Sequence, residues 1–442
     1  MHDPGQSRTD RRTFLRAALA AAGASALSAC ERRPKYENGK IIIDFYTYAT
    51  PEFLYVFEKR LIPEFERLNP HVKVRMTTNL GNAGYDAKLL TLIAGKLAPD
   101  LFHITQQNFP FYAAKDIVLP IDDYLREDGE LSASDFYPQV VEGMRFGGKL
   151  LGLPSDFSTI TMLYNQDMFD QHRIAYPSEA WTWQDYLDVA RKLTIDRDRD
   201  RRTDQYGTVN TNSYNRWPSW VWMNGGDILS PDGTRCMMDT PEAIGGLKFY
   251  VDLSHRYGVA PIPLMMNADQ ENVRLQELFI SRRCGMIAES RYIYKKFIPN
   301  VKFRWDVTHM PQHKTRATTF IWGGNCIMRG TRHPREAWEF LKFMSGPLGA
   351  EITLATGNAL PAYRKAAEQT VSLRRDEGVP LHDRLFIDAI PYCRQAPIPP
   401  QYAEFNQAMS VLQDAFLGLK TVEQACRQFT DEVNTALQAG VF

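Results

Sequence analysis

The amino-acid sequence predicts an α/β fold in which one domain is assembled from two separate stretches of the chain. Apolar, β-branched runs alternate with segments of helical spacing between residues 41 and 105, which is typical of a parallel sheet covered by helices. Between about residues 160 and 305 this pattern gives way to clusters of Trp, Tyr, Asn and Gly. It returns from residue 319. A pattern that stops and later resumes indicates a discontinuous domain.

The elements of the first stretch follow from local signals. Three apolar runs predict strands, at residues 41–48, 72–77 and 101–105. Two segments with helical spacing lie between them, at residues 53–68 and 85–96. Strands joined by single helices are parallel, and such sheets bind ligands at the loops that follow the carboxyl ends of the strands. We therefore expect the loops at 48–52, 79–84 and 106–109 to form a binding rim.

The rest of the chain is mostly helical by spacing. Helices are predicted at residues 183–193, 241–257 and 334–345, and the stretch 401–439 is helical with a gap near Gly418. An apolar run at 319–328 reads as a strand that is interrupted by Gly323 and Gly324.

The N-terminal region, residues 1–29, reads as an export signal peptide. The run Arg11-Arg12-Thr13-Phe14-Leu15-Arg16 resembles the twin-arginine consensus, and Leu27-Ser28-Ala29-Cys30 resembles a bacterial lipobox. The Ala-rich run between them is too short for a membrane span. These motifs predict lipidation of Cys30, a polar tether over residues 30–39, and a soluble body that is periplasmic or cell-surface and anchored to a membrane by lipid.

Composition and missing motifs exclude several classes of protein. Lys+Arg and Asp+Glu both number 52, so no net charge favours nucleic acid. The six Cys form no C-x-x-C pair. No P-loop, G-x-S-x-G, H-E-x-x-H or dinucleotide-binding glycine motif is present. We therefore expect a protein that is not an enzyme and that carries no cofactor.

Several short motifs, in this order, give the chain a resemblance to a known family. They are Ala98-Pro99-Asp100-Leu101-Phe102, Gly148-Lys149-Leu150-Leu151-Gly152-Leu153-Pro154, Leu163-Tyr164-Asn165-Gln166-Asp167-Met168-Phe169, Trp181-Thr182-Trp183-Gln184-Asp185-Tyr186, Asn224-Gly225-Gly226, Gly285-Met286-Ile287, Ala337-Trp338-Glu339-Phe340-Leu341 and Gly357-Asn358-Ala359-Leu360-Pro361. With them the chain resembles the family 1 extracellular solute-binding proteins of ABC importers, the group that includes maltose-binding protein.

The resemblance implies a two-lobed periplasmic-binding-protein fold, in which each lobe is a mostly parallel sheet flanked by helices. Residues 38–156 plus 319–358 would form lobe 1, and residues 157–318 plus 359–442 would form lobe 2. A hinge would let the lobes close around a ligand. The implied function is delivery of a sugar or oligosaccharide to the permease subunits of an ABC importer by a monomer.

Sugars present hydroxyls and apolar C–H faces, so their sites combine aromatic rings with polar side chains. The cluster Trp217, Trp220 and Trp222, set among Asn residues, is the densest candidate; the alternative is that these rings pack in the core. Tyr48 and Gln106 follow the first and third predicted strands. They are either rim ligands or ordinary loop residues.

Other candidates lie near the expected crossovers between the lobes. Asp156 is expected to accept hydroxyls, or else to cap the hinge turn. Trp322, Gly323 and Gly324 are expected where backbone approaches ligand, the alternative being a β-bulge beside a core Trp. The family resemblance implies that two further candidates, Glu289 and Arg291, face the cleft.

Arg291 bears on the class of ligand, because guanidinium binds carboxylate or phosphate in bidentate fashion. It would otherwise form a structural salt bridge. A binder of a phosphorylated polyol, another anion or a polyamine is therefore one alternative function. A secreted carbohydrate-active hydrolase is another, because Asp156 and Glu289 are two acidic residues near the expected cleft.

One loop resembles a calcium site. Carboxylates recur at Asp196, Asp198, Asp200 and Asp204, yet Arg201 stands where the sharp turn of a calcium loop has Gly, and interleaved Arg residues neutralise the charge. We expect a surface turn without metal, with calcium binding as the alternative.

Overall fold

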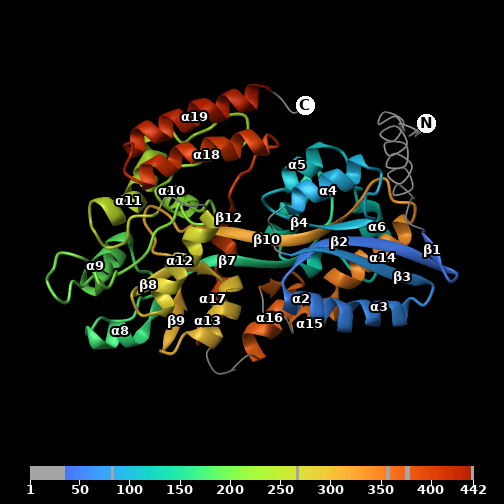
Figure 1. Ribbon diagram of the computed structural model, residues 1–442, viewed down its shortest axis with the longest axis horizontal. Helices are drawn as coiled ribbons and strands as arrows, with labels where there is room; N and C mark the ends of the chain where they lie inside the picture. The colour runs from blue at the N-terminus through green and yellow to red at the C-terminus, as the bar shows by residue number, and fades with distance from the viewer. Residues whose placement is uncertain (1–34, 81–83, 265–267, 355–358, 374–378, 440–442) are drawn as a thin grey trace, which may run out of the picture.

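The computed structural model describes residues 35–439 apart from 81–83, 265–267, 355–358 and 374–378. Two lobes lie side by side, and long strands run through the middle of the molecule from one lobe to the other (Figure 1). The strands are β1 (Tyr36–Glu37), β2 (Lys40–Ala49), β3 (Val72–Leu80), β4 (Leu101–Thr105), β5 (Arg145–Phe146), β6 (Lys149–Leu150), β7 (Leu153–Asn165), β8 (Met286–Ser290), β9 (Trp305–Thr308), β10 (Thr318–Ile327), β11 (Leu360–Pro361) and β12 (Cys393–Gln395).

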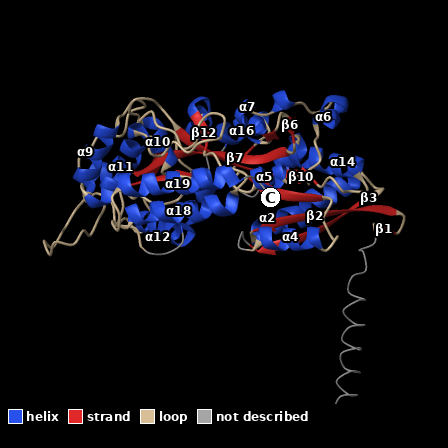
Figure 2. Cartoon of the chain, turned by 90° about the horizontal axis from the view of Figure 1, so that it is seen from above, coloured by secondary structure: helices blue, strands red, loops and turns tan. Residues whose placement is uncertain are grey.

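Helices cover the strands from both sides (Figure 2). Those before β7 are α2 (Pro51–Val56), η2 (Phe57–Leu61), α3 (Ile62–Leu68), α4 (Tyr85–Ala94), α5 (Phe109–Ala114), α6 (Asp122–Asp128), η3 (Ala133–Asp135) and α7 (Pro138–Gly143). Those after β7 are α8 (Gln166–Gln171), α9 (Trp183–Leu193), α10 (Pro218–Met223), α11 (Pro241–His255), α12 (Ala268–Ile280), η4 (Arg291–Ile293), α13 (Tyr294–Asn300), α14 (Pro334–Ser345), α15 (Pro347–Leu354), α16 (Arg364–Leu373), α17 (Leu385–Asp388), η5 (Ile390–Tyr392), α18 (Tyr402–Phe416) and α19 (Val422–Ala439).

Local sequence explains where several helices begin and end. The side chain of Thr182 accepts a hydrogen bond from the Asp185 N–H, and the Asp185 carboxylate accepts one in return, which forms a capping box at the start of α9. Thr240 caps α11, whose first residue is Pro241. The predicted helix at 53–68 is found as the continuous segments α2, η2 and α3, which end before Asn69.

The first lobe contains the parallel sheet that the sequence predicts. β2 pairs in parallel with β3 from Ile41↔Val72 onward, and with β4 at Phe45↔Leu101. β10 then pairs antiparallel with both β4 and β7. The three apolar runs at 41–48, 72–77 and 101–105 are thus confirmed as β2, β3 and β4.

The sheet of the second lobe is antiparallel. β8 and β9 both pair with the second half of β7, where Ile160 faces Ser290 and Asn165 faces Trp305. This lobe therefore differs from the mostly parallel arrangement that we expected in each lobe. The physical reason is that β7 carries the chain away from the hinge, whereas β8 and β9 both run back toward it.

The chain crosses between the lobes on three strands. β7 pairs with β10 as far as Thr159 and with β8 from Ile160, so it crosses first. β10 brings the chain back, and β11 pairs with β7 at Leu360↔Phe157 before the chain continues to α18 and α19. The expected boundary at residue 358 lies outside the described residues. The exact division of the chain into lobes stays a prediction.

Buried apolar side chains form two clusters. One centres on β2, β4, β10, α3 and α14 and extends to α12 and α13. The other fills the second lobe among α9, α10, α11, α18 and α19. The first cluster therefore continues from the first lobe into the second lobe, whereas the other cluster packs the helices of the second lobe.

The predicted export signal at residues 1–29, the lipidation site Cys30 and residues 30–34 of the tether lie outside the described residues. Among the helices that the structure describes, none combines the length and apolar character needed to cross a membrane.

Candidate functional site

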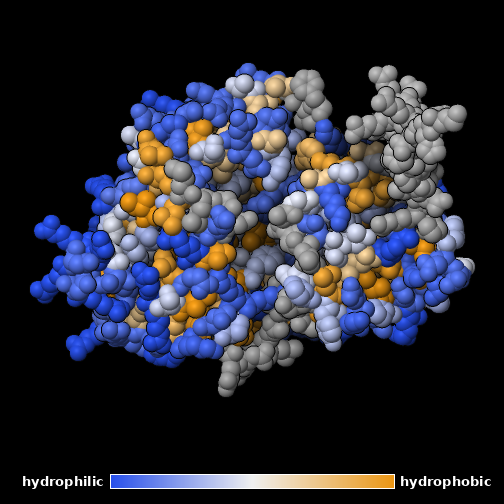
Figure 3. Space-filling model, viewed as in Figure 1, coloured by the Kyte–Doolittle hydropathy of each residue, from blue (hydrophilic) through white to orange (hydrophobic). Residues whose placement is uncertain are grey.

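A groove of about 640 Å³ lies between the lobes, and the space-filling view shows the molecule hollowed there (Figure 3). The first lobe contributes Gln107, which follows β4, and the crossing strand β10 contributes Ile321. The second lobe contributes the larger share. Its lining residues are Asn212, Ser213, Tyr214, Asn215, Arg216, Asn272, Ser290, Ile398, Tyr402, Phe405, Asn406, Met409, Ser410 and Gln413.

One face of α18 forms a wall of the groove. Tyr402, Asn406, Met409 and Gln413 recur at intervals of three and four residues, which places them on one side of a helix. The buried residue Val411 belongs to the opposite side, which packs in the second-lobe core. The helix therefore presents amides, an aromatic ring and a thioether to the groove.

The loop at residues 212–216 forms the facing part of the second lobe. Asn215 Oδ1 accepts a hydrogen bond of 3.1 Å from Gln106 Nε2, and this bond joins the two lobes. Gln106 also accepts a hydrogen bond of 3.0 Å from the backbone N–H of Trp322 on β10. Gln106 thus lies at the interlobe groove, where its amide links strand β10 to the loop of the other lobe.

The charged side chain that lines the groove is already paired. Arg216 donates a hydrogen bond of 2.6 Å to Glu289 Oε2, and both side chains are buried. Glu289 Oε1 accepts a second hydrogen bond, 2.9 Å long, from Gln276. Glu289 therefore neutralises and holds the Arg216 side chain that lines the groove, and it does not offer a free carboxylate to a ligand.

The structure places Arg291 in the protein interior, which corrects the expectation that it faces the cleft. Its side chain is 1% exposed and forms a bidentate pair with Asp383, in which the Nε–Oδ1 and Nη2–Oδ2 distances are both 2.9 Å. The guanidinium also lies over the ring of Tyr294. The pairing partner follows Arg291 by 92 residues, so local sequence did not reveal it.

The Trp cluster is likewise in the core rather than at the ligand. Trp217, Trp220 and Trp222 are at most 1% exposed. The ring of Trp220 stacks on Tyr250 with centroids 5.3 Å apart, and Arg394 lies over the ring of Trp222. The neighbouring Asn and Gly residues made the segment look too polar for a core. The rings pack there nonetheless, because α10 is enclosed by α9 and α11.

Trp322 and Gly324 are also packing residues. Trp322 is buried, and its Nε1 donates a hydrogen bond of 2.9 Å to Gln395. A Cβ on Gly324 would lie 2.9 Å from the carbonyl oxygen of Leu153 and 3.0 Å from the sulfur of Met144. Gly324 is therefore required by close packing of strands, at a point where the pairing of β10 with β7 shifts register.

Three of the predicted residues meet beside the hinge. Asp156, Gly323 and Tyr48 lie around His103: the Tyr48 and His103 rings are edge to face with centroids 4.8 Å apart, and a Cβ on Gly323 would lie 3.1 Å from both Asp156 Oδ1 and His103 Cε1. The hydroxyl of Tyr292, from the second lobe, donates to Asp156 Oδ1. We call Tyr48, His103, Asp156, Tyr292 and Gly323 the hinge cluster.

Burial controls the protonation of the hinge cluster. Desolvation raises the pKa of the Asp156 carboxyl above its usual value, although hydrogen bonds from Tyr292, Ser155 and the Gly323 backbone oppose this. Desolvation also raises the pKa of Tyr48, and the negative charge of Asp156 adds to the shift. The pKa of His103 falls to about 4 by burial. At neutral pH the cluster therefore holds a neutral imidazole.

The Asp-Arg loop forms a turn held by its own backbone. Asp196, Asp198 and Asp204 bring carboxylate oxygens within 4.8 Å of one another. Each carboxylate already accepts a backbone N–H: Asp204 from Arg197 at 2.7 Å, Asp196 from Arg201 at 3.0 Å, and Asp198 from Asp200 at 3.1 Å. These bonds explain the turn without a metal, and calcium binding stays an untested alternative.

Sequence reasoning missed His103, Tyr292 and the polar face of α18. His103 lies inside the apolar run at residues 101–105, whose pattern predicts a strand and does not single out one of its residues. Tyr292 approaches Asp156 only through the folding of the second lobe against the hinge. The helical spacing of Tyr402, Asn406 and Gln413 was the signal that could have identified the groove face of α18.

Comparisons with known proteins agree with this architecture. A family model described as bacterial extracellular solute-binding protein matches residues 60–380. The curated arabinooligosaccharide-binding protein of Bacillus subtilis (strain 168) is 24% identical over 317 residues, which cover 70% of each chain.

Two solved structures share the fold. An ABC substrate-binding protein from Listeria monocytogenes in complex with cycloalternan has a TM-score of 0.78 and 24% identity, over 90% of this chain and 99% of that one. The sugar-binding protein MalE from Xanthomonas citri has a TM-score of 0.76 and 18% identity, over 90% and 98%. The two-lobed fold is thereby confirmed. The family match spans well over half of the sequence, and the chain belongs to the bacterial extracellular solute-binding protein family.

Proposed function

We propose that the chain binds a neutral sugar or oligosaccharide in the interlobe groove and delivers it to the permease subunits of an ABC importer. The observation that carries this proposal is the chemistry of the groove lining. Amide and hydroxyl side chains alternate with Tyr214, Tyr402 and Phe405, and this combination suits the hydroxyls and C–H faces of a sugar. The curated relative is named for arabinooligosaccharide, which supports the same class of ligand.

Charge pairing favours a neutral ligand over an anion. Arg216 is the one charged residue among the described lining residues, and Glu289 already neutralises it. Arg291, the residue that suggested an anionic ligand, is committed to Asp383. An anion in the groove would have to compete with these buried carboxylates for its cation.

The same lining supports binding without catalysis. Glycoside hydrolysis uses two carboxyl groups on opposite sides of the scissile bond. Among the described residues that line the groove, none carries a carboxylate. A polyamine would need such carboxylates as well. We therefore propose a binding protein rather than a hydrolase or a polyamine receptor.

Ligand binding is expected to favour closure of the lobes. Gln107 and Ile321 approach the groove from the first lobe and the crossing strand, whereas α18 and the loop 212–216 belong to the second. A sugar that contacts both sides binds the closed form better and shifts the population toward it. In this proposal the export signal at 1–29 directs the chain across a membrane and is removed, and lipid on Cys30 then holds a monomer at the outer surface, where the importer receives its ligand.

The test is a thermal-shift and calorimetry screen of residues 31–442 against arabinotriose, maltotriose, glycerophosphocholine and spermidine. We expect a sugar to bind with micromolar affinity, on the order of −8 kcal/mol. A sugar at 100 times its dissociation constant would add about 2.7 kcal/mol to the free energy of unfolding. Binding of only the phosphodiester or the polyamine would contradict the proposal, as would breakdown of a bound oligosaccharide during long incubation.

Variants on α18 locate the binding site. Tyr402→Ala and Asn406→Ala remove groove-lining groups, and each should weaken sugar binding by about 1 kcal/mol, which is roughly fivefold. Gln407→Ala is the matched control, because Gln407 is exposed on the same helix and does not line the groove. Equal affinities for all three variants would place the site elsewhere.

A further inference from the structure

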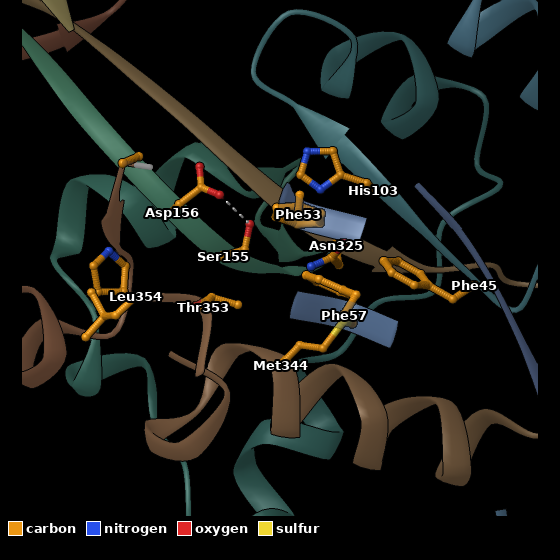
Figure 4. Close-up of a pocket in the computed structure, with 12 residues that line it drawn as sticks. Phe45, Phe53, Phe57, His103, Ser155, Asp156, Asn325, Met344, Thr353 and Leu354 are labelled. Carbon is orange, nitrogen blue, oxygen red and sulfur yellow. Dashed lines mark hydrogen bonds between the residues drawn. The ribbon is translucent and has the colours of Figure 1, made fainter. Parts of the chain in front are cut away.

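A second, smaller cavity of about 30 Å³ lies in the first lobe beside the hinge (Figure 4). Its polar lining residues are His103, Ser155, Asp156, Asn325 and Thr353. Its other described lining residues are apolar: Phe45, Phe53, Phe57, Met344, Leu354, Ala359 and Pro361. We call this cavity the hinge chamber. In the close-up, the carboxyl of Asp156 and the ring of His103 lie on opposite sides of the same space.

The hinge chamber and the interlobe groove are both lined by residues of β10. Ile321 lines the groove and Asn325 lines the chamber. Gly323 lies between them, about 7 Å from Ile321 along the strand, and faces Asp156 and His103. Because Gly323 has no side chain, no side chain at this position fills the space between the Asp156 carboxyl and the His103 imidazole, and the two groups face each other.

Two buried polar atoms of the chamber, His103 Nε2 and Asn325 Oδ1, make no hydrogen bond of ordinary geometry to a described residue. The Asn325 side chain still lies close enough to His103 to oppose the lowering of the His103 pKa by burial. The two residues are 6% and 3% exposed, respectively. A buried polar atom without a hydrogen bond costs about 1–3 kcal/mol, so a ligand that supplies the bond gains affinity. Asp156 adds an acceptor, since its Oδ1 receives the Tyr292 hydroxyl and its Oδ2 lies 3.3 Å from Ser155.

We propose that the hinge chamber receives the exocyclic hydroxymethyl group at one end of the bound sugar. This inference rests on the proposed function and adds a selection: the site recognises a sugar end that carries CH₂OH. The size agrees, because 30 Å³ holds roughly two water molecules, and a hydroxymethyl group has two heavy atoms. The apolar rings contact its carbon, while its hydroxyl lies between His103 and Asp156.

The far wall of the chamber makes it a site for a ligand end. Phe45, Phe57 and Met344 belong to the packed core of the first lobe and close the space behind the polar atoms. A chain of sugar units therefore does not continue through it. The groove holds the body of the ligand, and the chamber fixes which end points toward the hinge.

The experiment compares a sugar with its terminal deoxy form, in which CH₂OH is replaced by CH₃. Calorimetry of residues 31–442 uses whichever of arabinotriose and maltotriose binds more tightly, together with that deoxy form. For the unaltered chain we expect the deoxy sugar to bind at least about tenfold more weakly, which is 1.4 kcal/mol.

Two variants connect this preference to the chamber. In Gly323→Ala the new Cβ would lie 3.1 Å from Asp156 Oδ1 and from His103 Cε1, which narrows the entrance. In His103→Phe the unpartnered nitrogen is removed. Each variant should bind the parent sugar about tenfold more weakly and should distinguish the two sugars by less than about twofold. Gly330→Ala is the control, since a Cβ there meets nothing within 4 Å; it should bind like the unaltered chain.

The outcomes separate this inference from the proposed function. If the unaltered chain binds the parent and deoxy sugars equally, the chamber does not receive the hydroxymethyl group, although the proposed function stands. The same follows if both folded variants still bind the deoxy sugar about tenfold more weakly than the parent sugar. A cavity that holds only water would give the first result. Failure of both sugars to bind overturns the proposed function and this inference with it. Circular dichroism establishes that each variant is folded, and either variant alone suffices for the comparison.

Discussion

Removing Arg291 should destabilise the protein without weakening sugar binding. Arg291 is 1% exposed, and its bidentate pair with Asp383 has two N–O distances of 2.9 Å. In Arg291→Met the Asp383 carboxylate stays buried without its cation, which typically costs 3–5 kcal/mol of unfolding free energy. Replacing both partners, Arg291→Met with Asp383→Leu, removes the charge imbalance. The double variant should therefore recover most of the loss.

Urea unfolding followed by circular dichroism measures the stability, and calorimetry with the bound sugar measures the affinity of the folded fraction. Arg291 and Asp383 do not line the groove, so the affinity of each folded variant should stay within about twofold. An Arg291→Met protein of unchanged stability that loses most of its sugar affinity would refute this reasoning. That result would mean that Arg291 contacts the ligand.

Three further outcomes are expected. Burial lowers the pKa of His103 to about 4, so the unfolded chain binds a proton near pH 6.5 and the folded chain binds it only near pH 4. The free energy of unfolding therefore falls as the pH drops, by about 2 kcal/mol at pH 5. His103→Phe should remove this part of the pH dependence of urea unfolding. Trp220→Ala should cost about 3–5 kcal/mol of stability and leave the affinity of the folded protein unchanged, because Trp220 packs on Tyr250 in the core; a selective loss of affinity would contradict that placement. Excess calcium should leave the melting temperature unchanged, and an increase that Asp198→Asn abolishes would establish a metal site in the Asp-Arg loop.

The parts of the fold that depend on local patterns were predictable from the sequence. Continuous β-branched runs flanked by helical spacing identified β2, β3 and β4. Because ligands of parallel sheets gather at the carboxyl ends of strands, the same pattern predicted rim positions for Tyr48 and Gln106. The structure places Tyr48 against His103 and Gln106 in a hydrogen bond with Asn215, and their contact with ligand stays a prediction. The antiparallel sheet of the second lobe was not predictable in this way, since β8 pairs with a strand more than a hundred residues earlier.

The site was predicted less completely, because its contacts join distant segments. The composition around the Trp cluster is typical of a sugar-binding surface, but the same rings can also pack in the core. Which of the two occurs depends on their burial, and their burial depends on how α9 and α11 enclose α10. The partner of Arg291 lies 92 residues away. Asn215 meets Gln106 across 109 residues. Local spacing carries no information on such distant pairs. It does contain the helical spacing of the polar residues on α18.

The measurement that tests the central claim most directly is a crystal structure of residues 31–442 with the sugar that binds most tightly. The account predicts one sugar in the interlobe groove, in contact with Asn215 from one side and with Tyr402 and Asn406 on α18, and with Gln107 of the first lobe closed onto it. A sugar bound outside the groove, or a groove that stays empty at saturating sugar, would contradict the account.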